Sequence, residues 1–200
     1  MAKKPAIFLD RDGTVNEEMG YINHAERFVL FPFVADSIRI FNDLGFLVII
    51  VTNQSGIARG YFSERLMIQI HNQLCSDLKK MGARVDAIYY CPHHPTEGKG
   101  KYTRECNCRK PKPGMIEQAV LEYDIDLSRS FMVGDRYKDI EFARNLNMRA
   151  ALVLTGYGRG EYQYQRQSWQ YDPDIVGDNL LQVARQIKSD ILGQDGEPKR

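Results

Sequence analysis

Residues 6–14, which read AIFLDRDGT, decide the fold of this chain. Four apolar residues lead into two aspartates, Asp10 and Asp12, that are separated by a single arginine. A short unbroken apolar run is typical of a strand buried on both faces of a parallel sheet. Ligands of open parallel α/β sheets bind beyond the carboxyl ends of the strands, so both carboxylates are expected at a binding edge. The alternative interpretation is a strand followed by an Asx-type turn, for which Asp-Gly is a common sequence.

The rest of the chain alternates apolar strand patterns with amphipathic helix patterns. Strands are predicted at 6–9, 46–51, 86–90, 131–133, 150–154 and 174–176, and helices at 33–44, 64–81, 115–123, 137–146 and 178–192. This alternation favours an α/β fold with a doubly wound, Rossmann-like parallel sheet. We expect one domain over residues 1–192 and a polar, flexible tail over 193–200.

Three later segments carry polar residues at a strand end or a helix start. The apolar run 46–51 is followed by Thr-Asn-Gln-Ser at 52–55, and Arg-Lys-Pro-Lys-Pro-Gly at 109–114 precedes a predicted helix. The strand at 131–133 ends in Gly134-Asp135, and Asp139 follows one helical turn later. Together with Asp-x-Asp, these segments resemble the four motifs of the haloacid-dehalogenase-type phosphohydrolases, in the order found in that family.

The resemblance implies that a phosphate ester is hydrolysed through an aspartyl-phosphate intermediate. It makes Asp10 the nucleophile and Asp12 the general acid and base, while Thr52 and Asn53 donate hydrogen bonds to the phosphoryl oxygens. Lys110 supplies positive charge to the same oxygens. Lys112 also precedes a proline, but the motif lysine of the family opens the Lys-Pro-x-Pro run, which favours Lys110.

The resemblance also implies a divalent cation in the site. A hard cation such as Mg²⁺ prefers carboxylate and phosphate oxygens. The family pattern assigns Mg²⁺ to Asp10, the backbone carbonyl of Asp12, and Asp135. Asp139 is expected to orient Asp135 or Lys110.

Residues that flank the motifs are the expected substrate contacts. Besides Asp10, Asp12, Thr52 and Lys110, they are Arg11, Glu18, Met19, Gly20, Tyr21, Asn53, Gln54, Ser55, Arg109 and Arg136. Arg109 could bind a second anionic group of the substrate in a bidentate manner, or together with Lys112 simply solvate a helix start. Large cap domains of the family are inserted between the first and second or the second and third motifs. The short spacings here predict a capless enzyme whose selectivity comes from three loops, at 16–24, 91–108 and 155–165.

A cluster of metal-ligating residues occupies the loop at 91–108. Cys91 and His93, followed by Cys106 and Cys108, supply three thiolates and one imidazole, a closed set for a tetrahedral structural zinc. Few apolar residues anchor the intervening stretch, so zinc would substitute for a core. The alternatives to a zinc site are unrelated free thiols and a disulfide. His94 could compete with His93 as the zinc ligand, but position in the family motif favours His93.

The remaining histidines and cysteine lack the spacing of a site. His24 and His71 are expected to be structural or surface residues, and Cys75 a small buried packing residue in the amphipathic run 64–81.

Composition excludes several classes of partner. The formal net charge of the 200 residues is +1, with acids and bases interleaved, so bulk charge indicates no nucleic-acid surface. No apolar run is long enough to span a bilayer, and no secretory signal is evident. We therefore expect a cytoplasmic protein, and we expect it to be a monomer. The resemblance implies that its partner is a small phosphorylated sugar.

The loop at 91–108, called the zinc loop below, and the Cys-Arg-Lys-Pro-Lys-Pro-Gly segment at 108–114 narrow the resemblance to sugar-bisphosphate phosphatases of the family. They imply release of one phosphate from a heptose bisphosphate, in heptose supply for lipopolysaccharide or another surface glycan. Histidinol-phosphate phosphatase is the alternative enzyme. A non-catalytic phospholigand-binding protein and a nucleic-acid end-processing phosphatase are alternatives of other classes.

Overall fold

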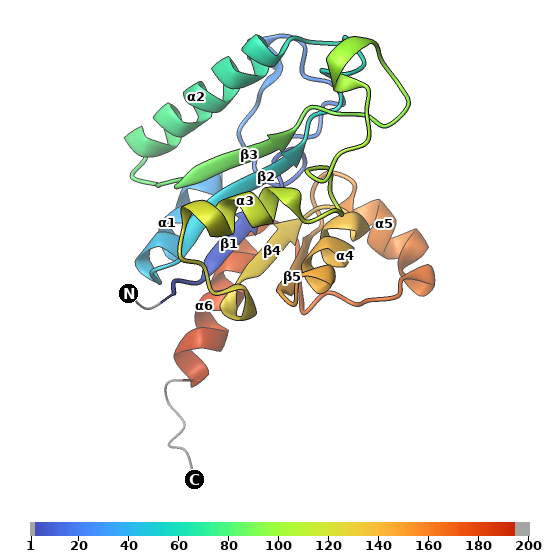
Figure 1. Cartoon of the computed structure of the whole chain (residues 1–200). Helices are drawn as coiled ribbons and strands as arrows, with labels where there is room; N and C mark the ends of the chain where they lie inside the picture. The colour runs from blue at the N-terminus through green and yellow to red at the C-terminus, as the bar shows by residue number, and fades with distance from the viewer. Residues whose placement is uncertain (1–2, 195–200) are drawn as a thin grey trace.

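A computed structural model describes residues 3–194 and contains one six-stranded parallel sheet. Its strands are β1 (Ala6–Leu9), β2 (Leu47–Asn53), β3 (Ala87–Cys91), β4 (Phe131–Gly134), β5 (Arg149–Val153) and β6 (Ile175–Gly177). They lie in the order β3-β2-β1-β4-β5-β6. The chain adds β2 and β3 on one side of β1 and β4, β5 and β6 on the other; Figure 1 labels the first five strands. The predicted doubly wound sheet is confirmed, because every predicted strand overlaps an observed one.

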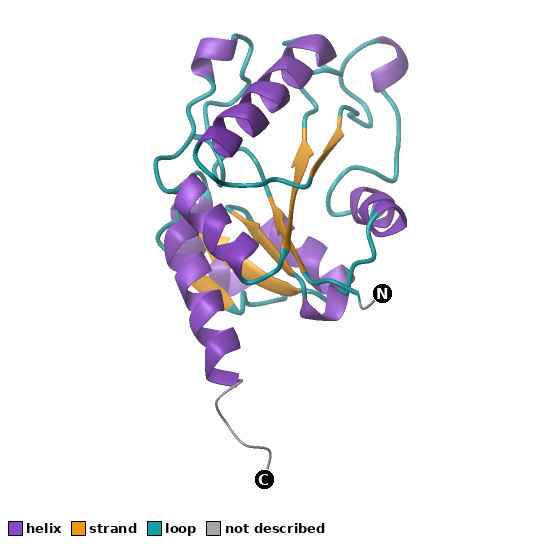
Figure 2. Cartoon of the chain, turned by 90° about the vertical axis from the view of Figure 1, so that its left-hand side faces the viewer, coloured by secondary structure: helices purple, strands orange, loops and turns teal. Residues whose placement is uncertain are grey.

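Helices cover both faces of the sheet. They are α1 (Val34–Asp43), α2 (Glu64–Lys80), α3 (Gly114–Glu122), α4 (Tyr137–Asn145), α5 (Gly158–Gln165) and α6 (Leu180–Gln194). Apolar residues of α1, α2 and α6 pack on one face, and those of α3 and α4 pack on the other. Figure 2 shows strands enclosed by helices on either side. Both layers bury apolar surface, which is the main favourable contribution to folding.

β1 is the central strand, and its position determines where the functional residues meet. All four residues of β1 are fully buried, and the strand pairs with β2 on one side and with β4 on the other. Leu9 lies opposite Ile50 of β2 and Val133 of β4. The residues that follow these three strands therefore leave the sheet at one edge.

The structure differs from the predictions in two helices. The predicted loop at 155–165 contains α5, an eight-residue helix that lacks an apolar stripe; its buried residues are Gly158 and Glu161. A helix is predicted from an apolar stripe of this kind, so α5 was not predicted from the sequence. Helix α6 continues to Gln194, two residues beyond its predicted end, and the rest of the predicted tail, 195–200, lies outside the described residues.

The connections between motifs contain no folded cap within residues 3–194. A loop, one short 3₁₀ helix and α1 separate β1 from β2, while α2, β3 and the loop at 92–108 separate β2 from α3. The predicted capless architecture is confirmed. Nor does any helix in this part of the chain have the length and apolar character to cross a membrane.

Candidate active site

The first side chains of the site stand where β1 ends. The N–H of Asp10 donates to the carbonyl of Val133 at 2.9 Å, which prolongs the sheet by one residue before the chain turns. Gly13 adopts a φ of +81°, and a Cβ at this position would overlap the carboxylate of Asp135. Only glycine combines this left-handed backbone with so close an approach. The Asp-Gly turn thus brings Asp10, Asp12 and Asp135 together.

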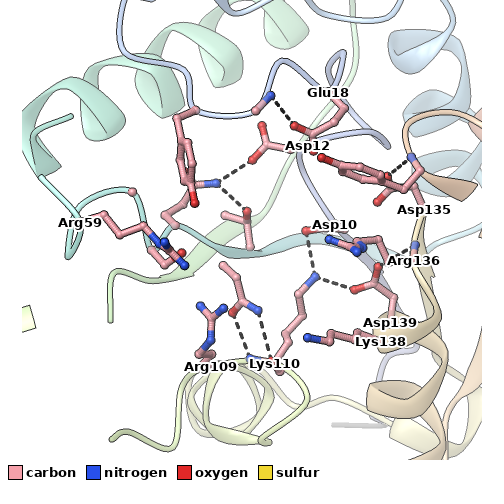
Figure 3. Close-up of a pocket in the computed structure, with 18 of the residues that line it drawn as sticks. Asp10, Asp12, Glu18, Arg59, Arg109, Lys110, Asp135, Arg136, Lys138 and Asp139 are labelled. Atoms are coloured by element: carbon pink, nitrogen blue, oxygen red, sulfur yellow. Dashed lines mark hydrogen bonds and ion pairs between the residues drawn. The ribbon is translucent and has the colours of Figure 1, made fainter. Parts of the chain in front are cut away.

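Lys110 lies at the centre of the site and is 5% exposed. Its Nζ is 2.8 Å from Oδ1 of Asp10 and 2.7 Å from Oδ1 of Asp139, as the dashed lines of Figure 3 show. Burial alone would lower the pKa of Lys110, but the charges of Asp10 and Asp139 raise it above its ordinary value. The lysine is therefore a fixed positive charge beside the candidate nucleophile.

Three carboxylates of this region form a candidate cation site. One oxygen from each of Asp10, Asp135 and Asp139 lies within 4.8 Å of the other two. Burial and the neighbouring carboxylates raise the pKa of Asp10 to about 7, although Lys110 opposes the rise. The same causes raise the pKa of Asp135 to about 9. So many buried acidic oxygens suit a hard divalent cation, whose charge would offset their repulsion.

Asp12 is held by hydrogen bonds from neighbouring polar side chains and not by Lys110. Its carboxylate accepts hydrogen bonds from Nη2 of Arg11 at 2.7 and 2.8 Å, from Asn16 at 3.0 Å and from Gln54 at 2.8 Å. Burial raises the pKa of Asp12, but Arg11 and the hydrogen bonds outweigh it, so the pKa is lowered. Nε2 of Gln54 also donates to Oγ1 of Thr52 at 2.9 Å, which joins the candidate acid to the end of β2.

The side chain of Arg11 is buried beside Asp12 and is only 2% exposed. The expected contact of Arg11 with the substrate stays a prediction. Its Nη1 is 3.0 Å from Nε2 of His71 in α2. Burial and the positive charge of Arg11 lower the pKa of His71 to about 3, so the imidazole is neutral and accepts from the guanidinium. His71 is thus structural, whereas His24 is exposed.

The side chain of Asn53 contacts the backbone of Lys110. Its amide donates to the carbonyl of Lys110 at 3.2 Å, and its Oδ1 accepts from the N–H of Lys110 at 3.0 Å. The pair joins the end of β2 to the segment before α3. Asn53 therefore positions the lysine, and the fully buried Thr52 remains the side-chain donor at this strand end.

A cleft of about 320 Å³ opens above these groups. The predicted residues that line it are Asp10, Asp12, Glu18, Gly20, Tyr21, Thr52, Asn53, Gln54, Ser55, Arg109, Lys110, Asp135 and Arg136. Met19, like the side chain of Arg11, is not part of the lining. Tyr157, from the predicted selectivity loop at 155–165, also lines the cleft. Arg59, Phe62 and Lys138 line it without having been predicted; Arg59 and Lys138 lie near recognised motifs, whereas Phe62 carries no motif signal.

The four predicted zinc ligands converge at the carboxyl end of β3. Sγ of Cys91 is 3.5 Å from Sγ of Cys106, and Nδ1 of His93 is 3.3 Å from Sγ of Cys108. All four ligand atoms lie within 4.8 Å of one another. Zinc–sulfur bonds of about 2.3 Å in a tetrahedron place ligand atoms about 3.8 Å apart, so the cluster fits a structural zinc.

Other thiol and imidazole groups stay outside this cluster. All four cysteines are free thiols, so the disulfide alternative is not observed. His94 points elsewhere: its Nδ1 accepts from the N–H groups of Thr96 and Glu97. Cys75, expected as a small buried packing residue, is half-buried in α2.

Comparisons with known proteins agree with this geometry. A family model described as HAD-hydrolase-like matches residues 107–183. The D-glycero-beta-D-manno-heptose-1,7-bisphosphate 7-phosphatase of Pasteurella multocida is 47% identical over 154 residues, 76% of this chain and 83% of that protein. The D-glycero-D-manno-heptose-1,7-bisphosphate 7-phosphatase of Thermosynechococcus vestitus is 41% identical over 92% of this chain and 95% of its own length.

A solved structure shares the fold over nearly the whole chain. It is the D,D-heptose 1,7-bisphosphate phosphatase of B. bronchiseptica in complex with magnesium and phosphate, with a TM-score of 0.80 and 34% identity over 93% of this chain and 99% of that one. The chain belongs to the haloacid-dehalogenase-like hydrolases, enzymes of the phosphatase class, and within them to the D-glycero-D-manno-heptose-1,7-bisphosphate 7-phosphatase family.

Proposed function

We propose that this protein removes the 7-phosphate of D-glycero-D-manno-heptose 1,7-bisphosphate. The observation that carries the chemistry is the pairing of Asp10 with Lys110 at 2.8 Å, in a cleft at the carboxyl edge of the sheet. The substrate class rests on relatives of that name, which match most of the chain at 41–47% identity. The product would supply heptose precursors of lipopolysaccharide or another surface glycan.

The reaction begins with attack of Asp10 on phosphorus. The forming aspartyl-phosphate and the departing alkoxide place negative charge on the phosphoryl oxygens and on the leaving oxygen. Lys110 and Thr52 stabilise the phosphoryl oxygens, while Asp12 gives a proton to the leaving oxygen. Asp12 then takes a proton from the water that hydrolyses the intermediate, which releases phosphate and restores Asp10.

Two metals belong to this proposal. Asp10, Asp135 and the backbone carbonyl of Asp12 would hold Mg²⁺, which supplies positive charge to the phosphoryl group. Asp139 acts through its contact with Lys110. Cys91, His93, Cys106 and Cys108 would hold a structural Zn²⁺ with no open position for water.

Substrate recognition in the absence of a cap is assigned to the loops around the cleft. Arg109 follows the last zinc ligand, and its Nη1 contacts the carbonyl of His93 at 3.4 Å. Its planar guanidinium suits the phosphate that is not hydrolysed. Lys112 instead pairs with Glu105 at the surface, in keeping with solvation of a helix start. We further propose that residues 1–192 act as one catalytic domain, and that the protein works as a cytoplasmic monomer on this small substrate.

The experiment that tests the substrate compares kcat/KM on both anomers of the heptose bisphosphate with kcat/KM on histidinol phosphate, using metal-replete protein. We expect the better anomer to exceed histidinol phosphate by more than about a hundredfold. A preference for histidinol phosphate would replace the heptose assignment and leave the phosphatase mechanism intact. Absence of phosphate release from every ester would instead support a phospholigand-binding protein.

A further inference from the structure

Arg59 is a cationic residue of the cleft that the proposed chemistry does not use. It lies in the loop between β2 and α2, lines the cleft, and its side chain is 22% exposed. Its Nη1 forms an ion pair with Glu97 of the zinc loop, residues 91–108. Glu97 is 56% exposed, and ion pairs at so exposed a carboxylate contribute little.

The other nitrogens of this guanidinium lack acceptors. Nε of Arg59 is buried without a hydrogen-bond partner among the described residues. Nη2 is 3.1 Å from Nε2 of His94, but Nδ1 of that imidazole already accepts from the N–H of Glu97 at 2.8 Å. A neutral histidine that accepts at Nδ1 carries its proton on Nε2, so the contact sets two donors against each other. A buried donor without an acceptor raises the free energy of the folded protein, and an acceptor on a bound ligand would lower it.

Position and charge indicate what the acceptor is. In Figure 3, Arg59 and Arg109 stand on one side of the cleft, away from Asp135, Arg136 and Lys138. Five carboxyl groups, Asp10, Asp12, Glu18, Asp135 and Asp139, line other parts of the same cleft. Two arginines without a carboxylate of the cleft between them form a site for an anionic group. Guanidinium groups bind phosphate oxygens with paired, charge-assisted hydrogen bonds.

The zinc loop packs closely enough on this segment to fix Arg59. The N–H of Lys99 donates to the carbonyl of Ala58 at 3.3 Å, and Gly98 is positioned so that a Cβ would overlap that carbonyl oxygen. The zinc loop also leads directly into Arg109. The zinc loop therefore fixes the positions of both arginines, Arg59 and Arg109.

We propose that Arg59 is a specificity-determining residue that binds the spared phosphate of the bisphosphate opposite Arg109. On substrate binding, the guanidinium exchanges its contacts with Glu97 and His94 for phosphate oxygens. This inference rests on the proposed function, because it takes the substrate to be a sugar with two phosphates.

The test measures kcat/KM of wild-type and Arg59→Gln enzymes on heptose 1,7-bisphosphate, heptose 7-phosphate and p-nitrophenyl phosphate. Arg59→Gln should lose roughly ten- to a hundredfold on the bisphosphate, and less than about twofold on the two monophosphates. Arg65→Gln, at an exposed position of α2 outside the cleft lining, is the matched control and should change none of the three values. Zinc content and melting temperature should stay at their wild-type values.

Glu97→Gln separates recognition from support of the loop. It removes the ion pair but keeps Arg59, so it should retain the preference for the bisphosphate. If Glu97→Gln reproduces the losses of Arg59→Gln, the arginine acts only by holding the zinc loop, and the inference is overturned. Equal losses of Arg59→Gln on all three substrates, or no loss at all, would overturn it as well.

Failure of the proposed function can be distinguished from failure of the Arg59 inference. A wild-type enzyme that hydrolyses p-nitrophenyl phosphate but neither heptose phosphate would contradict the substrate assignment. The Arg59 inference is then decided by calorimetry on Asp10→Asn protein, with and without Arg59→Gln. Fructose 1,6-bisphosphate should bind more tightly than fructose 6-phosphate only where Arg59 is present, and an unchanged difference would refute the inference.

Discussion

Asp12 shows how single residues set the chemistry. Its carboxylate is surrounded by donors from Arg11, Asn16 and Gln54, which lower its pKa. A carboxylate in this state is ionised at neutral pH and therefore has no proton of its own to give. We infer that substrate binding must weaken the contact with Arg11 before Asp12 can act as an acid. The proposed second step, deprotonation of water, uses the geometry as it stands.

The consequence is a variant in which the intermediate accumulates on p-nitrophenyl phosphate, whose leaving group departs without a proton. Asp12→Asn keeps the nucleophile but cannot deprotonate water, so turnover should fall by roughly 10²- to 10⁴-fold. Intact-mass spectrometry during turnover should detect protein heavier by one phosphoryl group. The double variant Asp10→Asn, Asp12→Asn is the control and should show no adduct. Near-normal turnover of Asp12→Asn would contradict the assigned role.

Arg109 and Lys110 are neighbours that should respond differently to truncation. Lys110 contacts Asp10, whereas Arg109 lies farther along the cleft wall and contacts the zinc loop. Arg109→Ala should lower kcat/KM on the bisphosphate by roughly ten- to a hundredfold and spare p-nitrophenyl phosphate. Lys110→Ala should lower both values alike. Parallel losses for Arg109→Ala would place that arginine in the chemistry instead.

Residues whose positions follow from strand ends could be predicted from the sequence. Asp10, Thr52 and Asp135 each follow an apolar run, and parallel strands bring such residues to one edge. The direction of the Arg11 side chain could not be predicted, because it depends on the turn at Gly13 and not on the strand. Arg59 was missed because its approach to the cleft depends on how the zinc loop packs. Contacts of this kind join segments distant in the chain and leave no local pattern.

At the scale of elements, the zinc loop is supported from several sides. Besides the four ligands, its Tyr102 donates to Oε2 of Glu64 in α2 at 2.5 Å, and Tyr90 of β3 donates to Oε1 of the same carboxylate at 3.0 Å. Glu64 thus joins α2, β3 and the loop. Element prediction was accurate where an apolar face exists, as in α1 and α2, and it failed at α5.

Loss of zinc should therefore disturb recognition more than the fold. Protein purified without chelators should contain one zinc per chain. Cys106→Ser should lose that zinc, increase amide exchange over residues 91–108 and weaken the preference for the bisphosphate. Activity on p-nitrophenyl phosphate should change much less, because Asp10 and Thr52 stand on the sheet. Zinc-free wild-type protein with an ordered loop would contradict the site.

The whole molecule gathers negative charge at one edge of its sheet. In metal-free protein, the folded-state pKa values of Asp10, about 7, and Asp135, about 9, lie above the ordinary value of 3.8. The folded state then binds more protons than the unfolded state between these values. The resulting stabilisation is complete below about pH 4 and is lost as the pH rises through 7 and 9.

Magnesium should reverse this trend. Metal-free protein should show a falling free energy of unfolding from about pH 6 to pH 9, measured by urea denaturation. Mg²⁺ at a hundred times the Kd measured at pH 7 should add about 2.7 kcal/mol at that pH. At the same Mg²⁺ concentration the gain should increase with pH, because protons compete with the cation. Asp135→Asn should abolish most of the gain. A stabilisation by Mg²⁺ that is equal at pH 6 and pH 9 would contradict this account.

The central claim is that Asp10 carries a phosphatase reaction on the 7-phosphate of the heptose bisphosphate. Phosphorus-31 NMR of the reaction tests it most directly, because the two phosphates of the substrate give separate signals. The account predicts that the 7-phosphate signal is replaced by inorganic phosphate while the 1-phosphate persists, and that Asp10→Asn protein leaves both signals unchanged. Loss of the 1-phosphate, or normal conversion by Asp10→Asn protein, would contradict it.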